Sequence, residues 1–236
     1  MSKQSFFEAV QQRHSVRAYL DKPLAQDVID AMQTKIDEIN TSAHLHVQLV
    51  VDEPKAFQST LAKYGKFSNV NNYVVMAGTP DADFDERIGY YGEQLVLLAQ
   101  TLGLNTCWVG LTYSKVVGAY TLSQGEKISC VIAIGYGATQ GIQHKSKPIH
   151  QVSNYTIYSP SWFRMGVESA QLAPTAVNQQ KFYFELQPDG KTVSVRSKFS
   201  LAGYTKIDIG IAKLHFEIGV QQSQHTKNSP CPFVWK

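Results

Sequence analysis

The segment RHSVRAY, residues 13–19, holds the densest group of side chains in this chain that could do chemistry. It places Arg13, Ser15 and Arg17 at alternate positions, with His14 between the first two. An arginine guanidinium is planar and permanently charged, so it suits a phosphate or a carbonyl-rich heterocycle better than lysine does. A serine hydroxyl and the N–H groups at a helix edge also favour anions. Two interpretations follow: a solvated charged turn and an anion-binding cradle.

The composition is that of a globular protein with little charge bias. The chain has 236 residues, of which 43% are hydrophobic, and a formal net charge of +3. This length suits one large domain or two small halves. The small charge and the lack of a long basic run argue against a nucleic-acid partner. The longest apolar runs are too short to span a bilayer, so no membrane partner is expected.

The cysteines and the N-terminus point to a compartment. Cys107, Cys130 and Cys231 are far apart and lack the spacing of metal ligands. An odd, sparse set is typical of reduced thiols rather than of a disulfide framework. The first residues lack the apolar run of a signal peptide. We therefore expect a cytoplasmic, soluble protein without a metal site.

Apolar periodicity predicts the elements that must position the arginine segment. Helices are expected over residues 4–12, 24–39, 54–65, 86–104, 161–173 and 206–220, with one more between two of the strands. Strands are expected over 45–51 and 72–78, near 106–110 and 128–137, and over 181–186 and 192–197, the last two as a hairpin.

The second part of the chain repeats the order of the first part. Residues 137–160 are polar, contain two prolines and show no clear period, which is typical of a long connector. Beyond them, helix, strand and helix recur over a shorter length. The stretches YGEQLVLLAQTLG and IGIAKLHFEIG match loosely, with Gly92 over Gly210. This pattern indicates a diverged internal duplication.

Five stretches together resemble the FMN-dependent nitroreductase family. RHSVRAYLDKPL is similar to its N-terminal signature, and LAPTAVNQQKFYF to its second signature, in which APS is followed by Asn and then QPW. GEQLVLLAQTLGLNTCWVGL resembles its central helix and the loop under the flavin. IAIGYG resembles its core strand, and HKSKP its late basic pair.

The order of these stretches differs from that of an ordinary family member. The APS-like segment arrives at Ala173, after the GYG strand and the basic pair. Its usual early place holds NTSAHLHVQLVV, which lacks the Pro and the Asn. Ordinary members are homodimers whose FMN sites draw residues from both subunits. The chain therefore resembles such a dimer fused into one polypeptide, as in the two-repeat branch called putative TM nitroreductases.

The resemblance implies an α+β, nitroreductase-like fold with two diverged repeats, in which a mostly antiparallel sheet is flanked by helices. Residues 1–150 would form the first half and residues 151–236 the shorter second half, with the FMN site between them. One FMN per chain is expected, bound even by a monomer, because both contributions are covalently joined. Further association stays open.

The first half would supply the polar end of that site. By resemblance, Arg13 and Ser15 would hold the FMN phosphate, with His14 contributing mainly its backbone. Arg17 would reach the pyrimidine edge of the flavin, where a fixed positive charge stabilises the reduced form. The connector would complete the phosphate clamp with the two basic residues Lys145 and Lys147, for which a solvated basic loop is the alternative.

Other positions follow from the same resemblance. The second half would contribute Pro174, Thr175, Ala176, Asn178 and Gln180. Thr stands where the family has Ser, and QKF stands where it has QPW, which predicts an altered substrate pocket. The backbone of Val109 and Gly110 would lie beside flavin N5. Trp108 is interpreted as core packing rather than a stacking partner, Glu93 as a surface or hydrogen-bonding position, and His215 as a satisfied residue of a helix interface. None of them is assigned a catalytic role.

The family's chemistry belongs to its flavin, so the first hypothesis is an FMN-dependent oxidoreductase. NAD(P)H would deliver a hydride as cosubstrate, leave, and be replaced by a small electron acceptor such as a nitroaromatic or quinone. The second hypothesis is a non-enzymatic FMN carrier or sensor, since the QPW segment is altered. A third is an offshoot with other flavin chemistry, such as reductive dehalogenation or flavin fragmentation.

Overall fold

The computed structural model describes residues 5–225 and 234–236, so Cys231 lies outside the described residues. The helices are α1 (Phe6–Gln12), α2 (Gln26–Ala43), α3 (Thr60–Tyr64), α4 (Phe84–Thr101), α5 (Ile149–Val152), α6 (Ser161–Ala170) and α7 (Thr205–His225), with short 3-10 turns at Lys55–Phe57 and Ala176–Asn178. The strands are β1 (Gln48–Val50), β2 (Asn72–Gly78), β3 (Asn105–Val109), β4 (Lys127–Gly135), β5 (Phe182–Leu186), β6 (Thr192–Ser197) and β7 (Val234–Trp235).

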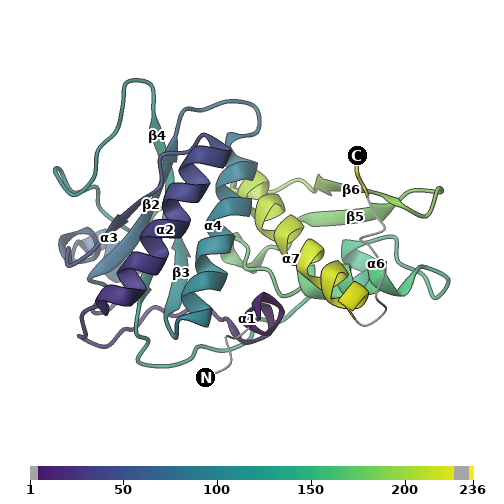
Figure 1. Cartoon of the computed structure of the whole chain (residues 1–236), viewed down its shortest axis with the longest axis horizontal. Coiled ribbons are helices and arrows are strands. Elements are labelled where there is room, and N and C mark those ends of the chain that lie inside the picture. The colour runs from purple at the N-terminus through teal and green to yellow at the C-terminus, as the bar shows by residue number, and fades with distance from the viewer. Residues whose placement is uncertain (1–4, 226–233) are drawn as a thin grey trace.

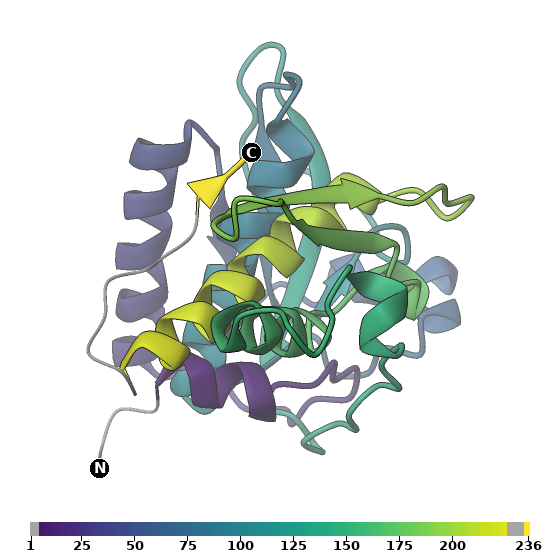
Figure 2. The same cartoon turned by 90° about the vertical axis from the view of Figure 1, so that its right-hand side faces the viewer.

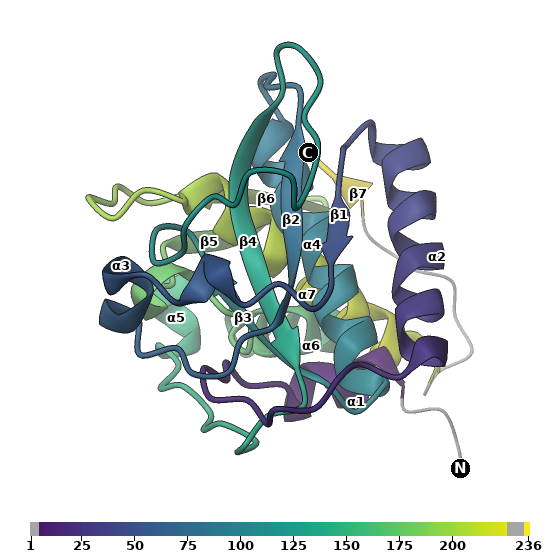
Figure 3. The ribbon, with the colours of Figure 1, turned by 90° about the vertical axis from the view of Figure 1, so that its left-hand side faces the viewer.

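The first sheet contains four strands in the order β1-β2-β4-β3, and all of its pairings are antiparallel. Its central strand β2 is buried along its whole length. Val74 and Met76 face one core, whereas Tyr73 and Val75 face another, as expected for the two-residue period of a strand. Figure 3 shows α4 behind the sheet and α2 beside its β1 edge, and both helices contribute to the core that contains Val74 and Met76.

The second sheet is smaller and is built from the later part of the chain. β5 and β6 form the predicted antiparallel hairpin, and β7 pairs with β6 in parallel. Figure 2 shows this sheet over α7 and α6. Helices α4 and α7 lie side by side between the two sheets (Figure 1), and one hydrophobic core contains residues from both parts of the chain.

Two glycines allow α4 and α7 to pack closely. A Cβ added at Gly89 would lie 2.0 Å from the carbonyl oxygen of Ile207. One added at Gly210 would lie 2.0 Å from the carbonyl oxygen of Glu86. Gly89 thus faces Ile207, three residues before Gly210, and Gly210 faces Glu86, three residues before Gly89. The close contact between the helices is therefore reciprocal around Gly89 and Gly210.

Most of the expected elements are present, and three differ. The strand expected over 45–51 is regular only from Gln48 to Val50. The helix expected over 54–65 is a 3-10 turn followed by α3, because the Ser59 side chain accepts a bond from Ala62 N and starts a new helix. The prediction of a helix between β3 and β4 is wrong. Its residues form turns, in which Gly118 and Gly125 adopt left-handed backbone that a helix excludes.

The fold is therefore α+β with mostly antiparallel pairing, as predicted. Among residues 5–225 and 234–236, none of the helices combines the length and the apolar character needed to cross a membrane.

Candidate functional site

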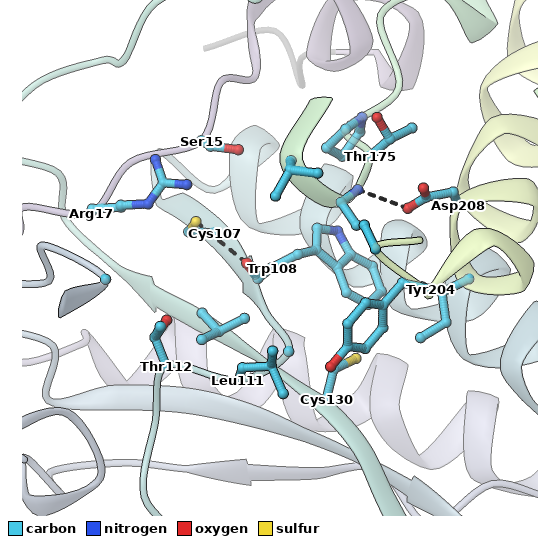
Figure 4. Close-up of a pocket in the computed structure, with 18 of the residues that line it drawn as sticks. Ser15, Arg17, Cys107, Trp108, Leu111, Thr112, Cys130, Thr175, Tyr204 and Asp208 are labelled. Atoms are coloured by element: carbon cyan, nitrogen blue, oxygen red, sulfur yellow. Dashed lines mark hydrogen bonds between the residues drawn. The ribbon is translucent and has the colours of Figure 1, made fainter. Parts of the chain in front are cut away.

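A pocket of about 680 Å³ lies between the arginine segment, the end of β3 and the start of α7. Figure 4 shows side chains from these segments pointing into it. Its volume is in the range of pockets that bind cofactors and other small molecules. It is lined by Ser15, Arg17, Tyr64, Gly65, Lys66, Phe67, Cys107, Trp108, Val109, Gly110, Leu111, Thr112, Cys130, Pro174, Thr175, Ala176, Val177, Ala202, Tyr204, Ile207, Asp208 and Ile211.

Ser15 and Arg17 form one polar side of the pocket. The arginine segment is held against β3, because Val16 N donates to the carbonyl oxygen of Thr106 at 3.0 Å. This contact buries Val16 and leaves the residues on either side of it exposed. The Arg17 guanidinium lies 5.9 Å from the centre of the Phe67 ring. A permanent positive charge and a hydroxyl are thus available to a ligand.

Arg13 has a different environment from Arg17. It is only 5% exposed and does not line the pocket. Its Nη1 donates to the carbonyl oxygen of Leu172 at 3.4 Å. Burial lowers the pKa of Arg13, while the nearby Glu93 carboxylate acts in the opposite direction. His14, beside it, is partly exposed, and its pKa is lowered by burial and by Arg13.

A buried polar network lies behind the pocket wall. Glu93 of α4 and His215 of α7 are both fully buried, and Glu93 Oε1 lies 2.8 Å from His215 Nε2. Glu93 Oε2 accepts a bond from Trp108 Nε1 at 2.9 Å. Of the roles left open for Glu93, hydrogen bonding is the one observed. Trp108 both packs against the core and lines the pocket, so packing is only part of its role.

Pro174, Thr175 and Ala176 form the wall contributed by the later part of the chain. Asp208, on the first turn of α7, holds this wall. Its Oδ1 accepts from Ala176 N at 2.9 Å, and its Oδ2 accepts from Gln179 Nε2 at 2.7 Å. Burial raises the pKa of Asp208 to about 6, although these two bonds act in the opposite direction.

Asn178 and Gln180 bind the connector and do not line the pocket. Their amides donate to the carbonyl oxygen of Lys145 at 3.1 Å and 2.9 Å. Lys147 Nζ donates to the carbonyl oxygens of Gln179 and Gln180 at 2.6 Å and 3.1 Å. Burial lowers the pKa of Lys147. The three side chains of Lys147, Asn178 and Gln180 are thus bonded to backbone carbonyl oxygens of these two segments.

The structure therefore divides the predicted site residues into two sets. The pocket brings together Ser15, Arg17, Val109, Gly110, Pro174, Thr175 and Ala176. Outside its lining are Arg13, His14, Lys145, Lys147, Asn178 and Gln180.

Sequence reasoning missed Tyr204 and Asp208, which belong to no motif. The segment AGY before the last helix offered only a turn signal. Cys107 and Cys130 are free thiols, and burial raises the pKa of each. Within the described residues, no group of three or more His, Cys, Asp or Glu side chains is placed to hold a metal ion.

The chain is similar to proteins of one family, both in fold and in sequence. A putative nitroreductase from Thermotoga maritima superposes with a TM-score of 0.67 at 22% identity, over 95% of this chain and 88% of that one. The chain therefore has a nitroreductase-like α+β fold. The model of the family described as "Putative TM nitroreductase" matches residues 5–220, and the chain belongs to that family.

Other solved structures are less similar. A putative NADH dehydrogenase/NAD(P)H nitroreductase from Parabacteroides distasonis has a TM-score of 0.49 at 19% identity, over 63% of this chain and 96% of that one. A putative nitroreductase in complex with FMN, from Desulfovibrio desulfuricans, has a TM-score of 0.48 at 14% identity, over 64% of this chain and 95% of that one. No curated protein matches the chain.

Proposed function

We propose that this protein is an FMN-dependent oxidoreductase that passes a hydride from NAD(P)H to an electron-poor acceptor such as a nitroaromatic or a quinone. The observation that carries the proposal is the pocket, which combines a cationic side with an apolar interior and has room for a cofactor. Family membership supports it, as does the FMN bound by the Desulfovibrio desulfuricans protein.

The residues that line the pocket fit FMN. Ser15 and Arg17 offer the hydroxyl and the guanidinium that an anionic or carbonyl-rich group requires. Gly110 lines the pocket directly after β3, and a side chain there would meet the Tyr204 ring on the same wall. When bound, FMN supplies the ring that accepts and donates a hydride.

The predicted phosphate clamp needs revision under this proposal. Lys147 is already bonded to two carbonyl oxygens, and Arg13 is buried against Leu172 and Glu93. Both are better suited to supporting the pocket walls than to contacting a ligand. Ser15 and Arg17 would then provide the direct contacts, and Arg13 would keep their segment in place.

Cofactor content and anaerobic reduction test the proposal. The purified protein should be yellow or become yellow with added FMN, and extraction should release FMN rather than FAD, about one per chain. Mixing with NADH and with NADPH under anaerobic conditions should bleach the flavin with at least one of them. Bound FMN that neither cosubstrate bleaches would favour the carrier or sensor. A protein that binds no FMN would refute both functions.

Arg17→Met tests the cationic side. Loss of a charge-assisted bond should weaken FMN binding by about 2 kcal/mol, or roughly thirtyfold. Arg196→Met is the matched control, because Arg196 is exposed and stacks on Tyr183, 4.7 Å from its ring centre, outside the pocket. Equal FMN affinities of the two variants would show that Arg17 does not contact FMN.

A further inference from the structure

Tyr204 covers the main chain at the end of β3. A Cβ added at Gly110 would lie 2.6 Å from Cζ and 2.6 Å from Oη of Tyr204, so the tyrosine ring rests directly on this glycine. Figure 4 shows the ring inside the pocket, on the opposite side from Arg17. The space beside Gly110 is therefore occupied by the aromatic ring of Tyr204.

The backbone of Tyr204 is held in an unfavourable conformation. Its φ is +58°, in the left-handed region that aromatic residues seldom adopt. The neighbouring carbonyl groups are fixed, because Gln179 Nε2 donates to the Gly203 oxygen at 3.0 Å and Asp208 N donates to the Tyr204 oxygen at 2.9 Å. Backbone strain that the surroundings maintain is typical of ligand-binding and catalytic sites.

The Tyr204 hydroxyl is free to bind a ligand. It makes no hydrogen bond within residues 5–225 and 234–236, although the ring is half-buried. Burial raises the pKa of Tyr204, so the phenol is neutral and can donate a proton to a hydrogen bond. Figure 4 shows the hydroxyl beside Cys130, with the cationic side of the pocket far across.

The charges near Tyr204 select the kind of ligand. The ionisable groups that act on its hydroxyl are Cys130 and Asp85, Asp208 lines the same side of the pocket, and none of the three carries a positive charge. An anionic group therefore finds no ion pair there and meets the repulsion of carboxylates, whereas a neutral oxygen can accept from the phenol without that cost. The ring itself offers an apolar face to a flat molecule.

We propose that Tyr204 is a specificity-determining residue for the electron acceptor: its ring packs against a flat acceptor, and its hydroxyl donates a hydrogen bond to the acceptor's neutral quinone or nitro oxygen. This inference rests on the proposed function. It assigns the cationic side of the pocket to the cofactor and the Tyr204 side to the second substrate.

Reoxidation of reduced flavin tests the inference. The parent, Tyr204→Phe and Tyr113→Phe proteins are loaded with FMN, reduced with dithionite without oxygen, and mixed with p-benzoquinone or with ferricyanide. Ferricyanide is an anion without a carbonyl oxygen. The control residue Tyr113 is half-buried but does not line the pocket.

For Tyr204→Phe, the ratio of the quinone rate to the ferricyanide rate should fall about tenfold, the size of one hydrogen bond. For Tyr113→Phe the ratio should not change. An unchanged ratio in Tyr204→Phe, or an equal fall in both variants, would overturn the inference while leaving the proposed function intact. A parent protein that retains no FMN would instead overturn the proposed function and this inference with it.

Discussion

The α4–α7 crossing, around Gly89 and Gly210, and the pocket beside it are neighbours with opposite properties. At the crossing, the helices touch through glycines, and its polar groups bond across the contact, as Glu93 does with His215 and Tyr90 with Glu217. The pocket is walled by loops and by the ends of elements, and it leaves the Tyr204 hydroxyl without a protein partner among the described residues.

The backbone shows the same contrast. The crossing consists of two regular helices. Near the pocket, Val177, Asn178, Gln180 and Tyr204 all have positive φ. Stability and binding are thus placed in adjacent but separate regions. Bonded polar pairs hold the helices together, whereas the Tyr204 hydroxyl faces the space where a ligand would bind.

The largest effect is expected from Glu93→Leu, which breaks the network behind the pocket. The change leaves the buried His215 ring and the Arg13 guanidinium without the carboxylate, and such a loss costs about 4 kcal/mol of unfolding free energy. Chemical denaturation measures it. The exposed pair Arg164–Glu168 provides the control, because Glu168→Leu should cost less than about 1 kcal/mol. Similar losses of unfolding free energy in the two variants would show that the buried network adds little to stability.

Asp208 should make the pocket wall sensitive to pH. Its folded-state pKa of about 6 exceeds the ordinary value of 3.8, so folding favours the protonated form. The stabilisation is complete below pH 3.8 and is lost as the pH rises through 6, with a total of about 3 kcal/mol. Unfolding free energies of the parent and of Asp208→Asn, measured from pH 4 to pH 8, isolate this contribution. Parallel pH profiles would contradict it.

The closeness of the crossing predicts the effect of Gly210→Ala. The new methyl group would meet the Glu86 carbonyl oxygen and force the helices apart, at a cost of about 2 kcal/mol after the better helix propensity of alanine is included. Gly103→Asn is the control, since nothing lies within 4 Å of an added Cβ there and Asn tolerates its φ of +79°. A stable Gly210→Ala protein would mean that the helices can separate without loss.

The smallest effect on stability is expected at Tyr204. Tyr204→Gly relieves the left-handed backbone, which offsets the lost ring packing and the greater unfolded-state entropy of glycine, so the unfolding free energy should change by less than about 1 kcal/mol. The same variant should reduce turnover of a quinone. Thermal unfolding and steady-state rates together would show whether the pocket trades stability for binding. A variant that loses both would indicate that Tyr204 is only a packing residue.

The sequence predicts the elements better than it predicts the site. A continuous apolar run identified β2, and apolar stripes identified α4 and α7, although β2 is buried on both faces and α7 on nearly all sides. Motif resemblance found Ser15 and Arg17, and it located the wall at Pro174. It did not show that Lys147 is bonded to carbonyl oxygens, since a motif records residue types and not their partners. Tyr204 depends on a contact with Gly110, far away in sequence, which no local pattern encodes.

The bond between Glu93 and His215 has a consequence for how this chain can evolve. A carboxylate on one helix meets an imidazole on the other, and both helices are encoded once in the same chain. In a pair of identical helices, every mutation would occur on both sides at once. Here each side can mutate alone, so the contact can become acidic on one face and basic on the other. The wall of the pocket that rests on it can be altered one residue at a time.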